Sequence, residues 1–121
     1  MLAPLLVIVL AGVGACVHSA IYTSNVEDKY PPIGTMVDVN GKRVHVIEAG
    51  NPDAPPVLMI HGASANAREF TFTLAPRLEQ DFHVLMADRP GHGYSGRPDN
   101  SERLGVQAAQ MAGAVPVLPQ G

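Results

Sequence analysis

The sequence contains little cysteine and no excess of basic charge. Cys16 is its single cysteine, so the chain can form no internal disulfide and no thiolate metal site of its own. Lysine and arginine number 8 against 11 aspartate and glutamate residues, for a net charge of -3. Nucleic-acid binding, which relies on clustered positive charge, is therefore not expected. We expect no cofactor and no metal.

Charge is also lacking at the start of the chain. No charged side chain occurs from Met1 to Asn25, and the apolar run Leu2–Tyr22 is long enough, as a helix, to cross roughly 30 Å of hydrocarbon. No lysine or arginine precedes this run, whereas signal peptides normally begin with positive charge. Residues 1–25 are therefore predicted to be a single-pass membrane anchor, with the lipid bilayer as a partner.

Two alternatives to an anchor remain open. The segment could be a cleaved secretory signal, which would make the protein secreted or periplasmic. It could also be a lipoprotein signal, because Val13-Gly14-Ala15-Cys16 resembles the motif that precedes a lipidated cysteine. Cys16 is the candidate lipidation site in that case.

Turn-forming residues divide the rest of the chain. Residues 26–33 include Pro31-Pro32, which suits an extended linker, and a domain is expected over residues 34–121. Two runs rich in β-branched residues, Met36–Val39 and Val44–Glu48, flank Asn40-Gly41. This dipeptide tolerates the positive φ angles of a two-residue turn, so the segment is predicted to be a β-hairpin.

Buried strands and helices alternate after the hairpin. Continuous apolar runs predict strands at Val57–Ile60 and Phe82–Ala87, each buried on both faces. Helical composition follows each strand, at residues 66–80 and again at residues 102–115, before Pro116 and Pro119. Alternating strands and helices indicate an α/β sheet, in which ligands gather beyond the carboxyl ends of the strands.

Two loops at those strand ends carry a family resemblance. His61-Gly62-Ala63-Ser64 follows the first buried strand, and Asp88-Arg89-Pro90-Gly91-His92-Gly93-Tyr94-Ser95 follows the second. In this order, with the hairpin ahead of them, they resemble the N-terminal signatures of the α/β-hydrolase superfamily. The resemblance covers roughly residues 34–110. It implies the N-terminal portion of an α/β-hydrolase sheet, preceded by a transmembrane or signal-like helix.

The resemblance also implies residue roles. The backbone N–H of Ala63 would contribute to an oxyanion hole, and Gly62 would leave out a side chain that could obstruct it. His61 resembles a histidine that braces this loop, and the hydroxyl of Ser64 is expected to cap the helix that begins near Asn66. The remaining loop-structuring positions that it implies are Asp88, Gly91, Gly93 and Ser95.

Asp88, His92 and Ser95 have the composition of a catalytic triad, but we do not expect them to act as one. Neighbours on a single turn seldom place a base against a nucleophile with a carboxylate behind the base. In Gly93-Tyr94-Ser95-Gly96 the second glycine follows the serine directly, so the Gly-x-Ser-x-Gly elbow is incomplete. Neither Ser95 nor Ser64 is expected to be a nucleophile, and no catalytic residue is assigned to this chain.

In the family, the nucleophile, the acid and the catalytic histidine come later than the part matched here. The chain is therefore expected to be a truncated, membrane-anchored hydrolase domain that is inactive alone. The full-length lineage would hydrolyse an ester, amide, epoxide or carbon–halogen bond of a small-molecule substrate.

The third strand of the family lies between the fourth and the fifth, so Val57–Ile60 should form an exposed edge. The alternative function is a non-catalytic, membrane-tethered interaction module.

Overall fold

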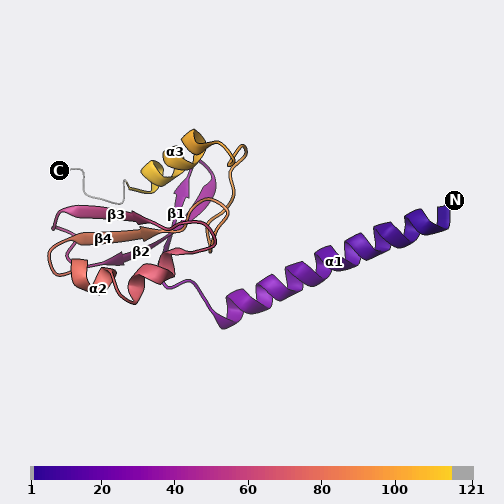
Figure 1. Cartoon of the computed structure of the whole chain (residues 1–121), viewed down its shortest axis with the longest axis horizontal. Helices are drawn as coiled ribbons and strands as arrows, with labels where there is room; N and C mark the ends of the chain where they lie inside the picture. Colours follow the sequence, from indigo (N-terminus) through magenta and orange to yellow (C-terminus); the bar gives the residue numbers. More distant parts are fainter. Residues whose placement is uncertain (1, 116–121) are drawn as a thin grey trace. The chain divides into compact units, whose positions relative to one another are not determined.

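The computed structural model describes residues 2–115, which fall into two compact units (Figure 1). The first unit, Met1–Pro32, contains a single helix, and the second, Ile33–Gly121, contains a four-stranded sheet with helices. Pro116 and Pro119, where we expected the last helix to stop, lie outside the described residues.

Helix α1 spans Leu2–Lys29, and every described residue in it is exposed. Its most apolar stretch has a mean hydropathy of 2.2, so it could cross a membrane by length and composition, although a signal sequence would meet the same criteria. The helix is longer than the expected Leu2–Tyr22 and includes residues 26–29, which we had placed in an extended linker. A proline restricts the backbone of the residue before it, which here is Tyr30. The helix can therefore continue as far as Lys29.

The hairpin forms as the sequence predicts. Strand β1 spans Thr35–Val39 and strand β2 spans Lys42–Ala49, paired antiparallel. Between them Asn40 has a φ of 53° and Gly41 a φ of 77°. Two successive positive φ angles are those of the type I′ turn, which is why an Asn-Gly pair fits this position.

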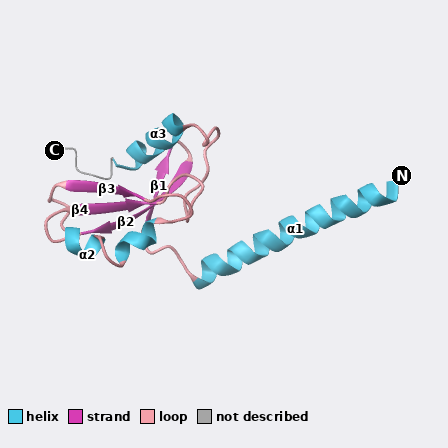
Figure 2. Ribbon diagram, in the orientation of Figure 1, coloured by secondary structure: helices cyan, strands magenta, loops and turns pink. Residues whose placement is uncertain are grey.

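The sheet has the order β1-β2-β4-β3. Strand β3 spans Pro56–Ile60 and β4 spans His83–Ala87; β3 runs parallel to β4, whereas β2 is antiparallel to β4 (Figure 2). All five residues of β4 are buried, as expected for a central strand. In β3 only Met59 is buried, and Ile60 is 47% exposed. Our expectation that β3 is buried on both faces is therefore wrong, because β3 is an edge strand of the described sheet, as the family's strand order implied.

Two short helical pieces replace the single helix expected over residues 66–80. The 3-10 helix η1 spans Ala67–Thr71, and α2 spans Ala75–Leu78. Pro76 lies in the first turn of α2, where a proline has no amide hydrogen bond to lose, so it starts a new helix instead of extending η1.

The cap of η1 is not the residue that we expected. The side chain of Asn66 accepts a hydrogen bond from the amide of Arg68 at 3.0 Å. Ser64 instead has a φ of 61°, in the left-handed region, and lies two residues before the capping position. The assignment of Ser64 as the cap is therefore wrong, and asparagine is an equally favourable capping residue.

Helices cover both faces of the sheet (Figure 1). Helix α3, which spans Leu104–Ala114 close to its expected bounds, contributes Met111 and Ala114 to a core with Val44 and Leu85. Ala67 of η1 and Ala75 of α2 belong to a second core on the opposite face. The second unit is therefore a three-layer α/β arrangement.

Candidate functional site

The two signature loops meet at one edge of the sheet. Strands β3 and β4 are parallel, and Ile60 pairs with Ala87, so the residues that follow both strands emerge together. The amide of Arg89 donates a hydrogen bond of 3.0 Å to Nε2 of His61. The prediction that the turn after β3 lies beside the loop after β4 is confirmed.

The His61 side chain is buried and uses both ring nitrogens. Because Nε2 accepts a hydrogen bond from the Arg89 amide, the proton of the neutral ring lies on Nδ1, which donates to the carbonyl of Gly62 at 2.8 Å. The ring of His92 lies nearby, with the two ring centroids 5.4 Å apart. With both nitrogens engaged, His61 links the two loops and has no free site for proton transfer.

Ala63 presents its backbone at the exposed part of this turn. The residue is exposed, and within residues 2–115 its N–H donates a hydrogen bond to no other group. A Cβ built at Gly62 would meet nothing within 4 Å among the described atoms, so a side chain there would clash with no protein atom, and the role of Gly62 in keeping the Ala63 N–H unobstructed stays a prediction. What the geometry offers is therefore one unengaged main-chain donor next to a braced loop.

The carboxylate of Asp88, directly after β4, accepts hydrogen bonds from three segments: β2, the start of η1 and the loop after β4. Its Oδ1 accepts from the amide of Ala67 at 2.7 Å, and its Oδ2 accepts from the amide of Tyr94 at 3.0 Å and from Nδ1 of His45 at 2.8 Å. Gly93, with a φ of 51°, passes so close that a Cβ there would overlap the carboxylate. A glycine is therefore required at this point of the loop.

These hydrogen bonds decide the ionisation of Asp88. Burial by itself would raise the pKa of this carboxyl group, but the hydrogen bonds from His45, Ala67 and Tyr94, together with attraction to His45, outweigh burial and hold the pKa below its ordinary value. Asp88 is consequently a carboxylate at neutral pH whose oxygens are occupied by donors.

His45 is the member of this network that sequence reasoning missed. Its Nε2 accepts from the amide of Gly34 at 3.1 Å, so Nδ1 carries the proton that it donates to Asp88. Its carbonyl accepts from the Asp88 amide at 3.0 Å, and its ring meets that of Tyr94 edge-on, with centroids 5.2 Å apart. The available signal was a histidine in the middle of the β-branched run of β2, which we considered only as part of a strand.

Ser95 is buried and hydrogen-bonded on both sides of its hydroxyl. Its Oγ donates to the carbonyl of Asp88 at 2.7 Å and accepts from the amide of His45 at 2.9 Å. Nδ1 of His92 lies 3.1 Å from the carbonyl of Pro90, and the Asp88 carboxylate contacts His45 instead of His92. Asp88, His92 and Ser95 therefore form no proton relay in this structure.

The other candidate residues have separate locations. Gly91, with a φ of 74°, donates from its amide to the carbonyl of Gly96 at 3.1 Å and so closes the loop. Cys16 is exposed and unpaired on α1. Among residues 2–115, no group of three histidine, cysteine, aspartate or glutamate side chains could hold a metal ion.

Comparison with known proteins identifies the fold to which this loop pair belongs. Residues 55–115, half of the chain, match the family model described as alpha/beta hydrolase fold. Epoxide hydrolase A of Mycobacterium tuberculosis is 38% identical over 75 residues, which cover 62% of this chain and 23% of that protein. A haloalkane dehalogenase of Mycolicibacterium paratuberculosis is 28% identical over 88 residues, which cover 69% of this chain and 29% of that protein.

Solved structures agree with this result. The haloalkane dehalogenase DbeA from Bradyrhizobium elkani matches with a TM-score of 0.63 and 30% identity, over 69% of this chain and 28% of the other. The epoxide hydrolase CorEH matches with a TM-score of 0.64 and 26% identity, over 70% of this chain and 29% of the other. The chain spans between 21% and 31% of the length of the curated relatives that it matches.

Proposed function

Because the chain belongs to the α/β-hydrolase fold family, we propose that it forms the N-terminal, oxyanion-side part of a hydrolase active site. The observation that carries this proposal is that Ala63 is an exposed residue whose N–H has no acceptor within residues 2–115, at the carboxyl end of a strand that runs parallel to its neighbour. A fixed main-chain donor at this position can stabilise negative charge that develops on a substrate oxygen.

The neighbouring residues act as supports for that donor. His61 ties the turn to the amide of Arg89, and Asp88 ties the start of η1 to the loop after β4 through Ala67 and Tyr94. Since a preorganised donor costs no rearrangement during the reaction, rigid bracing increases the stabilisation that Ala63 can give. We assign His61, Gly62, Asp88, Gly91, Gly93 and Ser95 to this structural role.

The reaction is the hydrolysis of a bond in a small molecule. Relatives and similar structures include an epoxide hydrolase, haloalkane dehalogenases and an esterase, so an ester, amide, epoxide or carbon–halogen bond is the expected target. The nucleophile, the acid and the catalytic histidine are proposed to come from residues outside this chain, because the Ser95 hydroxyl is engaged with two main-chain groups and Nδ1 of His92 lies against the carbonyl of Pro90.

Helix α1 is proposed to anchor this part of the hydrolase in a membrane. Its support is an exposed helix of 28 residues that includes the apolar run Leu2–Tyr22, which reaches the ~20 residues that a bilayer requires. A cleaved signal, or lipidation at Cys16, would produce a different attachment from the same segment.

An ester assay tests the chemical part of the proposal. Purified full chain in detergent, incubated with a short-chain p-nitrophenyl ester, should show no turnover above background, since it provides one oxyanion donor and no nucleophile–base pair. Ser95→Ala and Ser64→Ala variants serve as matched controls. Turnover that either substitution abolishes would show that a local serine attacks the ester, and the assignment of the nucleophile to another segment would be wrong.

A further inference from the structure

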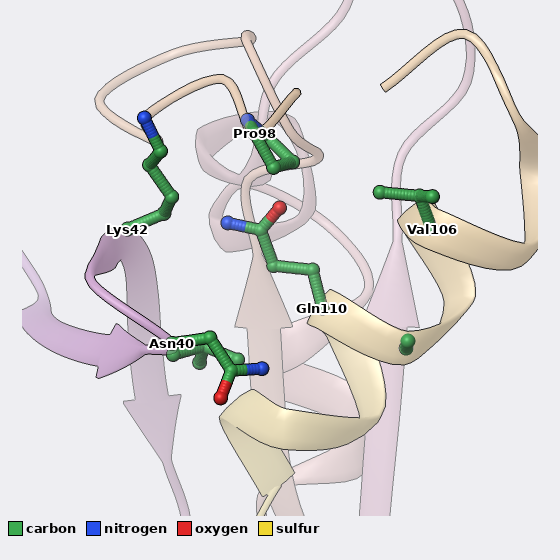
Figure 3. A pocket seen from close by; sticks show the side chains of 7 residues that line it. Asn40, Lys42, Pro98, Val106 and Gln110 are labelled. Carbon is green, nitrogen blue, oxygen red and sulfur yellow. The ribbon is translucent and has the colours of Figure 1, made fainter. Parts of the chain in front are cut away.

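A second feature of the molecule lies away from the turn at Ala63. A pocket of about 190 Å³ opens between the tip of the β1–β2 hairpin and helix α3 (Figure 3). Asn40 and Lys42 form its hairpin side, Val106 and Gln110 form its helix side, and Pro98 closes it from the intervening loop. Neither the turn after β3 nor the loop over residues 88–95 contributes to its lining.

Gln110 is the unusual member of this pocket. Its side chain extends from α3 towards Pro98 and the hairpin, and the residue is only 6% exposed. Both Nε2 and Oε1 are buried without a hydrogen-bond partner among the described residues. Buried side-chain amides are normally paired, and an unpaired one is costly, so each such group requires an explanation.

Gln107, one turn earlier on the same helix, provides the internal comparison. Its Oε1 accepts from Nη2 of Arg89 at 2.8 Å, and its Nε2 donates to the carbonyl of Ser101 at 2.7 Å. Helix α3 thus carries one glutamine with both amide atoms paired inside the protein and one with neither. The difference between them is that Gln110 borders the pocket.

We propose that this pocket binds a compact, uncharged molecule that carries a carboxamide or a lactam amide on an apolar body. A cavity of about 150 Å³ in another protein accommodates benzene, so a single substituted ring suits this volume. The side chains of Val39, Val106 and Ala109 provide apolar wall. The ligand amide would accept from Nε2 and donate to Oε1 of Gln110, and so pair both atoms at once.

The Gln110 side chain offers both a donor and an acceptor, so a charged ligand cannot pair with both of its polar atoms. A carboxylate has no proton to donate to Oε1, and an ammonium group has no acceptor for Nε2. Lys42 is exposed at the rim, where its charge is hydrated, so it does not determine what binds in the interior. Glutamine has three rotatable bonds, and the enclosed amide can turn towards the cavity when a ligand enters.

Three isosteric probes test this proposal: benzamide, acetophenone and benzoate. They share a phenyl ring and a carbonyl group, but acetophenone lacks the donor and benzoate is charged. Each would be titrated into the ¹⁵N-labelled full chain in lipid nanodiscs, and the side-chain amide signals of Gln110 would be followed by NMR. Benzamide should shift these signals and bind about tenfold more tightly than acetophenone, the effect of one buried hydrogen bond.

Two variants locate the binding. Gln110→Leu keeps the approximate volume of the side chain but removes both polar atoms, so benzamide loses two hydrogen bonds and acetophenone loses one; the tenfold preference for benzamide over acetophenone should therefore disappear. Ala109→Leu fills the pocket without touching the amide and should abolish binding of both probes. Their ¹⁵N spectra report whether each variant is folded, and the ranking of the probes on the unmodified chain decides the proposal independently of either variant.

Several results would overturn the proposal. Equal binding of benzamide and acetophenone would show that Gln110 does not recognise the amide. Tighter binding of benzoate than of benzamide would indicate that the charge of Lys42 selects the ligand. Undiminished binding to a folded Ala109→Leu variant would place the ligand elsewhere. No shift of the Gln110 signals at millimolar benzamide would mean that the pocket does not take this class of ligand.

Discussion

At the scale of single residues, one buried carboxylate organises the edge of the sheet. Asp88 receives donors from β2, from the start of η1 and from its own loop, while Ser95 pairs with both Asp88 and His45. Removing one partner from such a network leaves buried groups unpaired, which costs more than the hydrogen bond contributed.

The first residue-scale prediction concerns Asp88→Asn. An asparagine amide group would place a donor against one of the donors from His45 or Ala67, so the variant should unfold about 2 kcal/mol more easily. Urea denaturation at pH 7 measures this difference. Asp53→Asn is the matched control, because Asp53 is exposed and, among the described residues, its backbone amide alone is hydrogen-bonded; equal effects of the two substitutions would contradict the role of Asp88.

The pKa of Asp88 predicts how stability depends on pH. The pKa is lower in the folded state than the ordinary value of 3.8, so the stabilisation from the carboxylate is fully present above that value. It is lost as pH falls below 3.8 through the folded pKa, when the group becomes protonated. Wild-type protein should therefore lose stability faster than Asp88→Asn below about pH 4; parallel acid unfolding curves would be inconsistent with this carboxylate being ionised.

Some residues of this network could be predicted from the sequence and others could not, for a physical reason. Asp88 and Ser95 lie in one loop whose glycines and proline signal a special backbone conformation. His45 is separated from Asp88 by 43 positions, and only the antiparallel pairing of β2 with β4 brings them together. Long-range partners of this kind are decided by strand register, which local patterns do not encode.

At the scale of elements, the strands were easier to predict than the short helices. Strand β4 and the hairpin carry strong local signals, in apolar runs and in Asn40-Gly41, and both form where expected. The segment containing η1 and α2 has helical composition, but Pro76 starts a second piece and Asn66 replaces Ser64 as the cap. The exposure of β3 depended on which strands flank it, a property of topology and not of its own composition.

Helix α3 offers an element-scale prediction with a built-in control. A Cβ added at Gly105 would meet nothing within 4 Å, so Gly105→Ala should stabilise the protein by up to about 1 kcal/mol through helix propensity. A Cβ added at Gly113 would press against Cγ1 of Val39, so Gly113→Ala should instead destabilise by about 1 kcal/mol. Thermal unfolding of both variants tests the packing of α3 on β1, and a gain in stability from Gly113→Ala would contradict it.

Helix α1 gives the second prediction at this scale. If it spans a bilayer, the full chain should remain in the membrane pellet during alkaline carbonate extraction. High pH disrupts electrostatic attachment to the membrane surface, but it does not release roughly 30 Å of apolar helix from the hydrocarbon. Cys16→Ser should remain attached equally well. Release of the unmodified chain would rule out a spanning anchor, whereas release of Cys16→Ser alone would favour lipidation.

At the scale of the whole molecule, the chain corresponds to the N-terminal part of an α/β-hydrolase fold, and we propose that it holds one side of the active site. The family match covers residues 55–115, and the relatives extend well beyond the segment that they share with this chain. Here the parallel strands β3 and β4 deliver their following loops to the same edge of the sheet, where ligands of α/β proteins generally bind. The central claim is therefore that the N–H of Ala63 serves chemistry completed by residues outside this chain.

A chimera tests that claim most directly. Residues 33–115 of this chain would replace the matching segment of the M. tuberculosis epoxide hydrolase A, to which 75 residues of this chain align at 38% identity. The chimera and its Ala63→Gly variant, which keeps the amide, should hydrolyse an epoxide. Ala63→Pro, which removes the N–H, should lower kcat by about 10²- to 10³-fold with little change in the unfolding temperature. An Ala63→Pro chimera as active as its parent, or a folded parent chimera without activity, would contradict the account.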